Sequence, residues 1–402
     1  MKPRLRFLSI ILVLSLCSIP AWNLAQQRGA PSPFPGGENP DGSLKPTARL
    51  QRLFSQDAYT EYALLEPGSE QFRIRFLTEE MRVGATELVN ATRGGSEGTD
   101  VEVFDPRTGK PMKFTYEVQG DTHAIHAQFA APVPEGGIGR ALIYKTYKDA
   151  RTYQYYPEAN PAFNIQAGDI SWVRSLSGYR LGVILPKGYS LLSSNVAAQM
   201  STLADGRLKL HFANPSGLSN PFTLHARKSP TEFTPTTFTD MFFDDVKTLY
   251  DLDQPDTHAI RVDQIYSDFR RGAKEPLDLM TYAPLQDLKV IDLDTAKPLT
   301  TSAGKATTVA LAVPIENEMQ SAHLRVTGKL VDANYKAVNG TLTFSRTMKG
   351  LRNTVLLPAG WEVASASQSG TMGVYQGRAF IAFINLNSEN DYHVVITARK
   401  PR

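Results

Sequence analysis

The chain has 402 residues, a formal net charge of +3 and a single cysteine, Cys17. Lys2, Arg4 and Arg6 account for that charge, so the rest of the chain is close to neutral and offers no basic face for nucleic acid. Beyond Cys17 the chain has no residue for a disulfide, a thiolate nucleophile or a cysteine metal site.

Residues 1–25 have the pattern of a secretory signal peptide. Basic residues precede an apolar run from Phe7 to Cys17, and Ala21 or Ala25 offers a cleavage point. The run is short for a bilayer span, so an uncleaved anchor is the less favoured alternative, and no later apolar run is long enough. Residues 26–49 are rich in Pro, Gly and polar residues and predict a flexible tether. We therefore expect an exported protein, periplasmic or extracellular, with no transmembrane segment after signal removal.

An internal duplication organises the rest of the chain. Arg174–Tyr189 (RSLSGYRLGVILPKGY) returns 172 residues later as Arg346–Trp361 (RTMKGLRNTVLLPAGW), with seven of sixteen positions identical. Unrelated segments of this length would match at roughly one position. Upstream, matched residues such as Asp57 and Asp245 are 188 apart, so the first copy carries 16 extra residues (188 − 172), most of them between residues 147 and 171. Loops tolerate such insertions while the framework is kept.

Each copy has the sequence pattern of β-structure. Short runs alternate apolar and polar residues, as half-buried strands do, and Gly, Pro, Asn and Asp separate them. Examples are Phe72–Phe76, Ala141–Tyr147, Leu208–Phe212 and Ala379–Ile384. We therefore predict an all-β fold of two tandem antiparallel β-sandwich-like domains, residues 50–230 and 231–402. Residues 50–62 and 238–250, which open the copies, are ambiguous and could each hold a short helical turn.

Two kinds of turn recur in both copies. In LPKGY and LPAGW a proline stops ladder pairing and a glycine permits a tight turn, so Tyr189 and Trp361 should fold onto the core. The dipeptides DG at 205–206 and QG at 376–377 lie between strand-like runs and predict hairpin turns. A motif kept in both copies favours a shared packing role.

The sequence carries no catalytic or metal-binding signature. HExxH and GxSxG are absent, and His123 and His126 have an odd spacing that sends strand side chains to opposite faces. Asp292 and Asp294 could bind calcium, but Arg107 takes the place of Asp294 in the first copy. Carboxylates that cap turn N–H groups are therefore the favoured interpretation. We predict no metal and no cofactor.

Four arginine pairs kept in both copies admit two interpretations. They could bind an anion, but an arginine more often packs its stem on a sheet while its head bonds a carbonyl or carboxylate. The acidic pair Glu79-Glu80 is similarly interpreted as a solvated turn rather than as catalytic carboxylates. The arginine pairs are Arg82/Arg270, Arg174/Arg346, Arg180/Arg352 and Arg207/Arg378.

A tyrosine-rich stretch of the first copy is the best candidate for a binding surface. It contains Tyr147, Tyr153, Tyr155 and Tyr156, and part of it belongs to the insertion that the second copy lacks. Aromatic faces on an exposed loop could stack on sugar rings. The alternative is that these rings pin the long loop to the sheet.

The runs TYKD (146–149), LPKGY (185–189) and DGRLKLHFAN (205–214) resemble uncharacterised exported bacterial proteins with tandem β-domains. The resemblance implies an exported compartment. Our leading hypothesis is an exported, non-enzymatic binding or envelope-associated protein that binds carbohydrate or an envelope protein through the tyrosine-rich loop. A secreted hydrolase with a site built from distant loops between the two domains is the first alternative. A structural module of an envelope assembly is the second.

Overall fold

The computed structural model describes the chain from Asp57 to Lys400 with gaps, so the predicted signal peptide and tether lie outside the described residues. The described ranges are 57–91, 98–120, 122–176, 178–214, 220–231, 233–236, 245–269, 277–279, 285–303, 307–386 and 392–400. Contacts group the chain into Met1–Thr47 and Ala48–Arg402, and every described residue belongs to the second unit. None of the helices in these ranges has the length and apolar character needed to cross a membrane.

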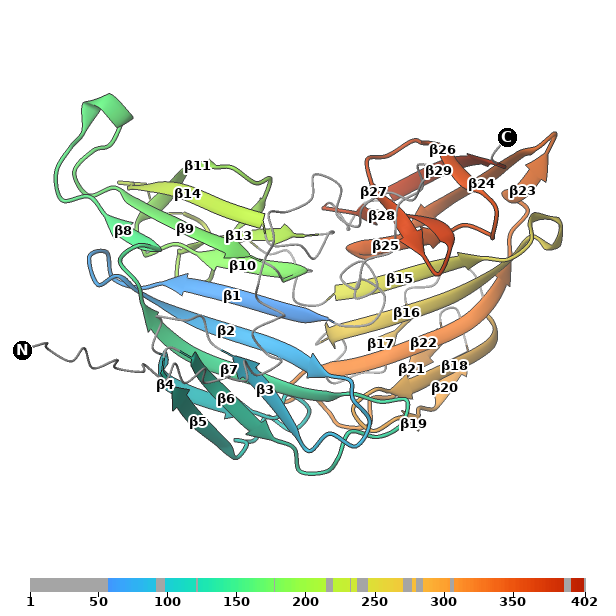
Figure 1. The fold of residues 1–402 in the computed structure, drawn as a ribbon, viewed down its shortest axis with the longest axis horizontal. Coiled ribbons are helices and arrows are strands. Elements are labelled where there is room, and N and C mark those ends of the chain that lie inside the picture. Colours follow the sequence, from blue (N-terminus) through green and yellow to red (C-terminus); the bar gives the residue numbers. More distant parts are fainter. Residues whose placement is uncertain are drawn as a thin grey trace, which may run out of the picture. The chain divides into compact units, whose positions relative to one another are not determined.

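Three sheets form the first copy (Figure 1). The seven-stranded sheet has the order β12-β13-β10-β1-β2-β7-β4, the four-stranded sheet β11-β14-β9-β8 and the three-stranded sheet β3-β6-β5. The bounds are β1 (Ala58–Leu64), β2 (Gln71–Glu80), β3 (Glu87–Ala91), β4 (Gly98–Phe104), β5 (Phe114–Gln119), β6 (Thr122–Gln128), β7 (Gly139–Lys148), β8 (Tyr153–Tyr155), the 3-10 helix η2 (Pro161–Phe163), β9 (Ile170–Leu176), β10 (Arg180–Ile184), β11 (Tyr189–Ser194), β12 (Gln199–Thr202), β13 (Leu208–Ala213) and β14 (Asn220–Lys228).

Three sheets also form the second copy. The eight-stranded sheet has the order β19-β18-β22-β16-β15-β25-β28-β27, the four-stranded sheet β23-β24-β29-β26 and the three-stranded sheet β17-β21-β20. The bounds are β15 (Asp245–Leu252), the 3-10 helix η3 (Pro255–Thr257), β16 (Ala259–Phe269), β17 (Leu277–Asp278), β18 (Gln286–Asp292), β19 (Lys297–Pro298), β20 (Thr301–Ala303), β21 (Thr307–Val309), β22 (Ala322–Val331), β23 (Tyr335–Val338), β24 (Thr341–Met348), β25 (Arg352–Leu356), β26 (Glu362–Ala366), β27 (Thr371–Tyr375), β28 (Arg378–Ile384) and β29 (Tyr392–Arg399).

The sheets of the two copies match strand for strand. Read from β27 to β18, the large sheet of the second copy gives the equivalents of β12 to β4 in the same order. Each large sheet contains one parallel pair, β1 with β10 and β15 with β25, in an otherwise antiparallel ladder. Even the registers coincide, because Tyr59 pairs with Arg180, and Lys247 with Arg352, at offsets of 188 and 172. The predicted duplicated, all-β, sandwich-like fold is confirmed.

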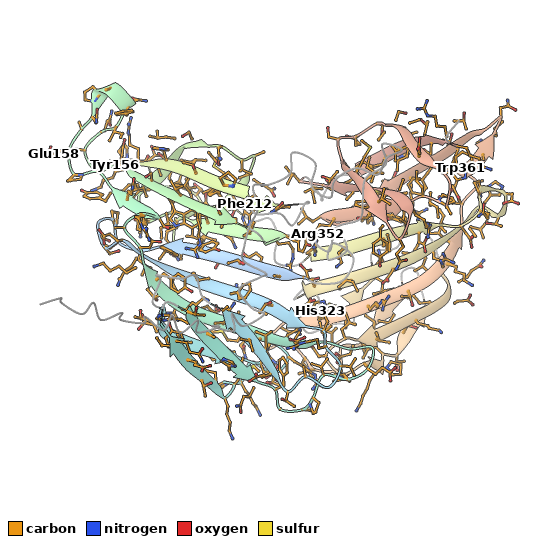
Figure 2. The ribbon with its side chains drawn as sticks, viewed as in Figure 1. Tyr156, Glu158, Phe212, His323, Arg352 and Trp361 are labelled. Atoms are coloured by element: carbon orange, nitrogen blue, oxygen red, sulfur yellow. The ribbon has the colours of Figure 1, made fainter. Side chains whose placement is uncertain are left out.

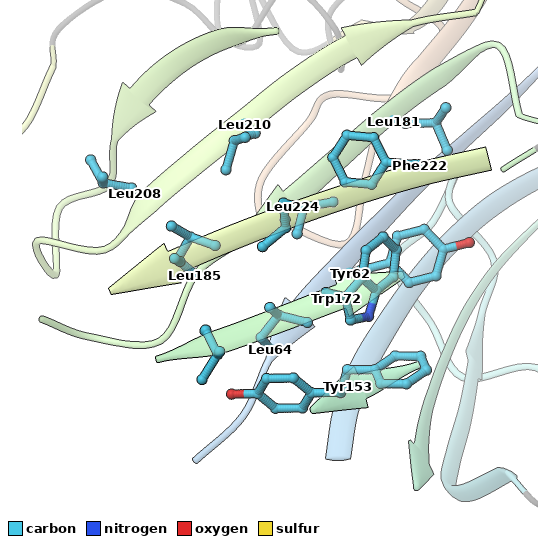
Figure 3. Packing of buried hydrophobic residues seen from close by; sticks show 14 of the residues in the cluster. Tyr62, Leu64, Tyr153, Trp172, Leu181, Leu185, Leu208, Leu210, Phe222 and Leu224 are labelled. Carbon is cyan, nitrogen blue, oxygen red and sulfur yellow. The ribbon is translucent and has the colours of Figure 1, made fainter. Parts of the chain in front are cut away.

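Each copy packs its own aromatic core between the large sheet and the four-stranded sheet. In the first copy the ring centroid of Trp172 lies 5.0 Å from that of Tyr62 and 6.1 Å from that of Phe72 (Figure 3). In the second, Phe344 replaces Trp172 and lies 6.0 Å from Tyr250, the equivalent of Tyr62. Burying these rings stabilises each copy by roughly 25 cal/mol per Å² of apolar surface.

The LPxG(Y/W) corner is confirmed in both copies. The N–H of Tyr189 donates to the Pro186 carbonyl over 3.2 Å, and that of Trp361 to the Pro358 carbonyl over 3.3 Å. The intervening glycines have φ values of 78° and 77°, which L side chains rarely adopt. Both aromatic side chains are 6% exposed and belong to the cores. The predicted hairpin turns also form, joining β12 to β13 and β27 to β28.

Two local features refine the sequence-based picture. The segments that open the copies are strands, β1 and β15, over most of their described residues, and not the helical turns that the sequence allowed. In the insertion, the offset between paired equivalents falls from 182 at Tyr153/Tyr335 to 172 at Trp172/Phe344, so 10 residues (182 − 172) are added between β8 and β9. This loop carries η2 and projects beyond the strands of the first copy (Figure 1).

Candidate ligand cavity where the copies meet

The four candidate tyrosines do not share one exposed face. Tyr147 and Tyr153 are each 1% exposed, and the Tyr153 hydroxyl donates to a backbone carbonyl that follows β1 over 3.0 Å. Tyr156 is half-buried and bonds neighbouring polar side chains, whereas Tyr155 is 40% exposed. Most of these rings therefore fasten the long loop to the sheets, and Tyr155 is the one that presents its face to solvent.

A buried cluster of two aspartates and two arginines joins the copies. Asp57 and Asp245 occupy equivalent positions where β1 and β15 begin, and Arg180 and Arg352 are the equivalent first residues of β10 and β25. Arg352 Nε donates to Asp245 Oδ2 over 2.7 Å, and its Nη2 also bonds Asp57 of the other copy. Arg180 Nε lies 3.4 Å from Asp57 Oδ1 and 3.8 Å from Asp245 Oδ2. Each arginine thus contacts both copies, and Figure 2 places Arg352 where they meet.

The two carboxyl groups of this cluster titrate in opposite directions. Burial alone would raise the pKa of Asp57, but Arg180 and Arg352 outweigh it and hold that pKa well below its ordinary value. Burial raises the pKa of Asp245, because the same two arginines do not offset it there. Asp57 also accepts a hydrogen bond from the Ser267 hydroxyl over 2.6 Å. Equivalent positions in the repeat therefore have different electrostatic surroundings.

The loops before β7 and β22 make a reciprocal contact. The N–H of Ile138 donates to the Leu293 carbonyl over 2.8 Å, and the N–H of Ser321 donates to the Pro106 carbonyl over 2.8 Å. The two donors are 183 residues apart, which is also the offset between paired residues of β7 and β22, and the two acceptors are 187 apart. Each copy therefore makes the same bond to the other.

A cavity of about 370 Å³ opens beside the ion cluster. Asp57, Glu79, Lys247 and His323 contribute its polar lining, and a volume of this size is typical of small-molecule pockets. Val83, on its apolar side, is 63% exposed, so the cavity reaches solvent there. The apolar lining residues are Met81, Val83, Ile138, Leu249, Ile265 and Leu293, drawn from both copies.

Lys247 is a cavity residue whose charge has no direct partner. Within the described ranges no hydrogen bond or ion pair reaches its ammonium group, and burial lowers its pKa against the opposing effect of nearby carboxylates. Other charged groups of the lining are already engaged. Asp263 and Arg325 pair at 2.6 Å, and Glu79 Oε1 lies 3.3 Å from His323 Nε2.

His323 is a buried imidazole at the meeting of the copies (Figure 2). Burial, reinforced by the charge of Arg140, holds its pKa well below the ordinary value, so the ring is neutral near pH 7. With its proton on Nε2 it would donate to Glu79 and leave Nδ1 as an acceptor. Nδ1 has no partner among the described atoms.

The interpretation of Glu79-Glu80 as a solvated turn is wrong for Glu79. Both residues belong to β2, where successive side chains point to opposite faces. Glu79 is therefore buried and accepts the N–H of Asp57 over 3.0 Å, whereas Glu80 turns outward and bonds Arg82 over 2.8 Å.

At the equivalent place in the first copy, the space is filled. Tyr59 stands where the second copy has Lys247 and is 0% exposed. It clusters with Leu77 and Leu142, and Met319 from the second copy's loop packs against them. An aromatic ring and a thioether thus occupy a volume that, at the other end, belongs to the cavity.

Gly136 accounts for the open end. It is the equivalent of Met319 in the reciprocal loop contact, 183 residues earlier. Its φ is 76°, and a Cβ at this position would meet no atom within 4 Å. Met319 fills space from its loop, whereas Gly136 leaves it empty.

The remaining acidic candidates act within turns. Asp105 Oδ1 accepts the N–H of Arg107 over 2.9 Å, and Asp292 Oδ1 accepts the N–H of Asp294 over 2.9 Å, which confirms the turn-capping interpretation. Asp294 additionally binds Arg140 of the first copy through Nε over 2.6 Å. Within the described part of the chain, no group of three or more His, Cys, Asp or Glu side chains is arranged to hold a metal ion.

Most members of the arginine pairs have structural partners, as expected. Arg174 and Arg346 lie over the equivalent rings of Tyr62 and Tyr250, at 5.4 and 5.7 Å. The exception is the Arg180/Arg352 pair, whose cluster borders the cavity. Arg82 bonds Glu80, Arg207 bonds Asp205, Arg378 bonds Asp251, and Arg270 lies outside the described residues.

No protein-family model and no curated protein matches the chain. A similar solved structure is an M1 zinc metallopeptidase from Deinococcus radiodurans, with 12% identity, a TM-score of 0.29 and coverage of 42% of this chain and 41% of that one. Another is an aminopeptidase N family protein from Idiomarina loihiensis, with 7% identity, a TM-score of 0.26 and coverage of 42% and 29%. The chain spans less than half the length of either protein, and likenesses at this level carry no functional argument.

Sequence reasoning missed Glu79, Lys247 and His323 as residues that share one site. They lie on three strands, β2, β15 and β22, and no local spacing connects them. The available signal was divergence between the copies, because Lys247 stands where the first copy has Tyr59.

Proposed function

We propose that the chain is an exported, non-enzymatic binding protein that takes a small molecule into the cavity where its copies meet. The observation that carries the proposal is the cavity of about 370 Å³, which combines apolar walls with the unpartnered ammonium group of Lys247. Pockets of this kind, apolar with few polar groups that fix orientation, are the usual form of small-ligand sites. The signal-peptide pattern of residues 1–25 supports export.

Dye binding tests this proposal. The anionic apolar dye 1-anilinonaphthalene-8-sulfonate should bind saturably with increased fluorescence. Val83→Trp, placed at the exposed part of the lining, should block it, whereas Val331→Trp should not, because Val331 is similarly exposed, at 62%, and lies outside the lining. Absence of saturable binding, or equal binding by both variants, would contradict the proposal.

A carbohydrate or partner surface on the first copy's long loop is a second candidate. Tyr155 is 40% exposed, and Phe163 in η2 is 75% exposed, so two aromatic faces on this loop are available for stacking. Binding to a polysaccharide panel, measured for the parent and for Tyr155→Ala with Phe163→Ala, tests it. Equal binding by both proteins removes the loop as the site.

A hydrolase is the third candidate, supported by the contact of a neutral His323 with Glu79 beside the cavity. Such a histidine can act as a general base if a substrate reaches it. Turnover of a panel of chromogenic esters and peptides, abolished by His323→Gln, would establish it, and no turnover by the parent would exclude it for that panel.

A further inference from the structure

We propose that the cavity is built for a small carboxylate with an apolar tail, whose carboxylate bonds Lys247 and whose tail takes the place that Met319 occupies at the other end. This inference rests on the proposed binding function and names the class of ligand. It is carried by the comparison of the two equivalent places.

The apolar part of the proposal comes from that comparison. In the first copy, the thioether chain of Met319 packs on Leu77 and Leu142. In the second copy the loop offers Gly136 instead, and a Cβ there would face open space. The surrounding lining stays apolar, so a ligand tail would remove apolar surface from water at roughly 25 cal/mol per Å².

The charged part comes from Lys247. An ammonium group has three donors and no acceptor, and none of the donors is satisfied within the described residues. Neighbouring acceptors are already engaged, because Glu79 receives the N–H of Asp57 and contacts His323. A ligand that brings its own anionic oxygens would satisfy the ammonium, and such charge-assisted bonds are shorter and stronger than neutral ones.

Both features differ from the first copy at matched positions. Tyr59 replaces Lys247, and Met319 replaces Gly136. The same departure from the repeat that opens the space therefore also supplies a cation next to it. This pairing is what a tailed carboxylate requires, and neither acetate nor an uncharged alcohol would use both parts.

Calorimetric titration of the intact protein tests the class of ligand with four probes: octanoate, octan-1-ol, octylamine and acetate. Octanoate should bind about 10-fold to 100-fold more tightly than octan-1-ol, the range expected for a hydrogen bond to a charged group. Acetate and octylamine should show no measurable binding. Lys247→Met should bring octanoate down to the affinity of octan-1-ol and leave octan-1-ol unchanged. Lys148→Met, which removes a lysine with a 66% exposed side chain outside the lining, should behave as the parent.

The outcomes separate this inference from the function on which it rests. Equal affinities of octanoate and octan-1-ol in the parent, or an unchanged preference in Lys247→Met, would overturn the carboxylate class while the cavity still binds. Dye binding without any octyl probe, or tighter binding of octylamine, would overturn it as well. If neither the dye nor any probe binds, the proposed function itself is lost.

Discussion

Replacing Arg352 with methionine should destabilise the whole described unit. Arg352 bonds Asp245 of its own copy and Asp57 of the other, and its side chain is only 10% exposed. Methionine keeps much of the stem's volume and removes the charge, which leaves two buried carboxylates short of a donor. Loss of one partner from a buried ion pair typically costs about 3–5 kcal/mol of unfolding free energy.

A surface pair provides the matched control. Arg325 also bonds an aspartate, Asp263, at 2.6 Å, but its side chain is 44% exposed. Arg325→Met should therefore cost only about 0–1 kcal/mol. Urea unfolding followed by circular dichroism gives both values, read as shifts in midpoint at constant slope.

A double-mutant cycle decides whether the charges act as a unit. Asp245→Asn combined with Arg352→Met should cost less than the sum of the single changes, by roughly 0.5–3 kcal/mol. The reasoning is refuted if Arg352→Met costs no more than Arg325→Met, or if the two changes at the cluster simply add.

Three further predictions follow from backbone geometry and titration. Gly188→Ala and Gly360→Ala should each cost about 1–2 kcal/mol and agree closely, because both glycines have positive φ at equivalent corners with no atom near a new Cβ; unequal midpoints in urea would contradict this. The lowered pKa of His323 means that the unfolded chain binds more protons, so stability should fall as pH drops through about 6.5, and His323→Gln should flatten that fall in urea titrations at several pH values. Burial, with the charge of Arg174 adding to it, lowers the pKa of Lys145 to about 7, so stability should rise with pH from about 7 toward 10.4, and Lys145→Met should abolish the rise; a parent protein whose stability is flat over this range would refute it.

The fold was predictable because its signals are local or repeated. Alternation marked strands such as β2 and β7, and the offset from Arg174 to Arg346 survives in three dimensions as stacking over equivalent rings. The parallel pairing of β1 with β10 left no local trace, because its residues are more than a hundred positions apart.

The cavity was not predictable for a related reason. Its lining comes from several strands and loops of both copies, and its opening depends on what is missing at Gly136. The matched pairs were interpreted correctly as structural in most cases. Differences between the copies carried the information about the site, but the tyrosine-rich loop drew attention because it is a long insertion, whereas single replacements such as Tyr59 by Lys247 are inconspicuous in sequence.

The reciprocal bonds at Ile138 and Ser321 have a consequence for stoichiometry. A homodimer made from two identical halves would repeat each interface residue, so it would have either two pockets or two plugs. One continuous chain escapes that rule, since Met319 can close one end while Gly136 leaves the other vacant. Each molecule then offers a single berth, and a titration should saturate at one equivalent per chain.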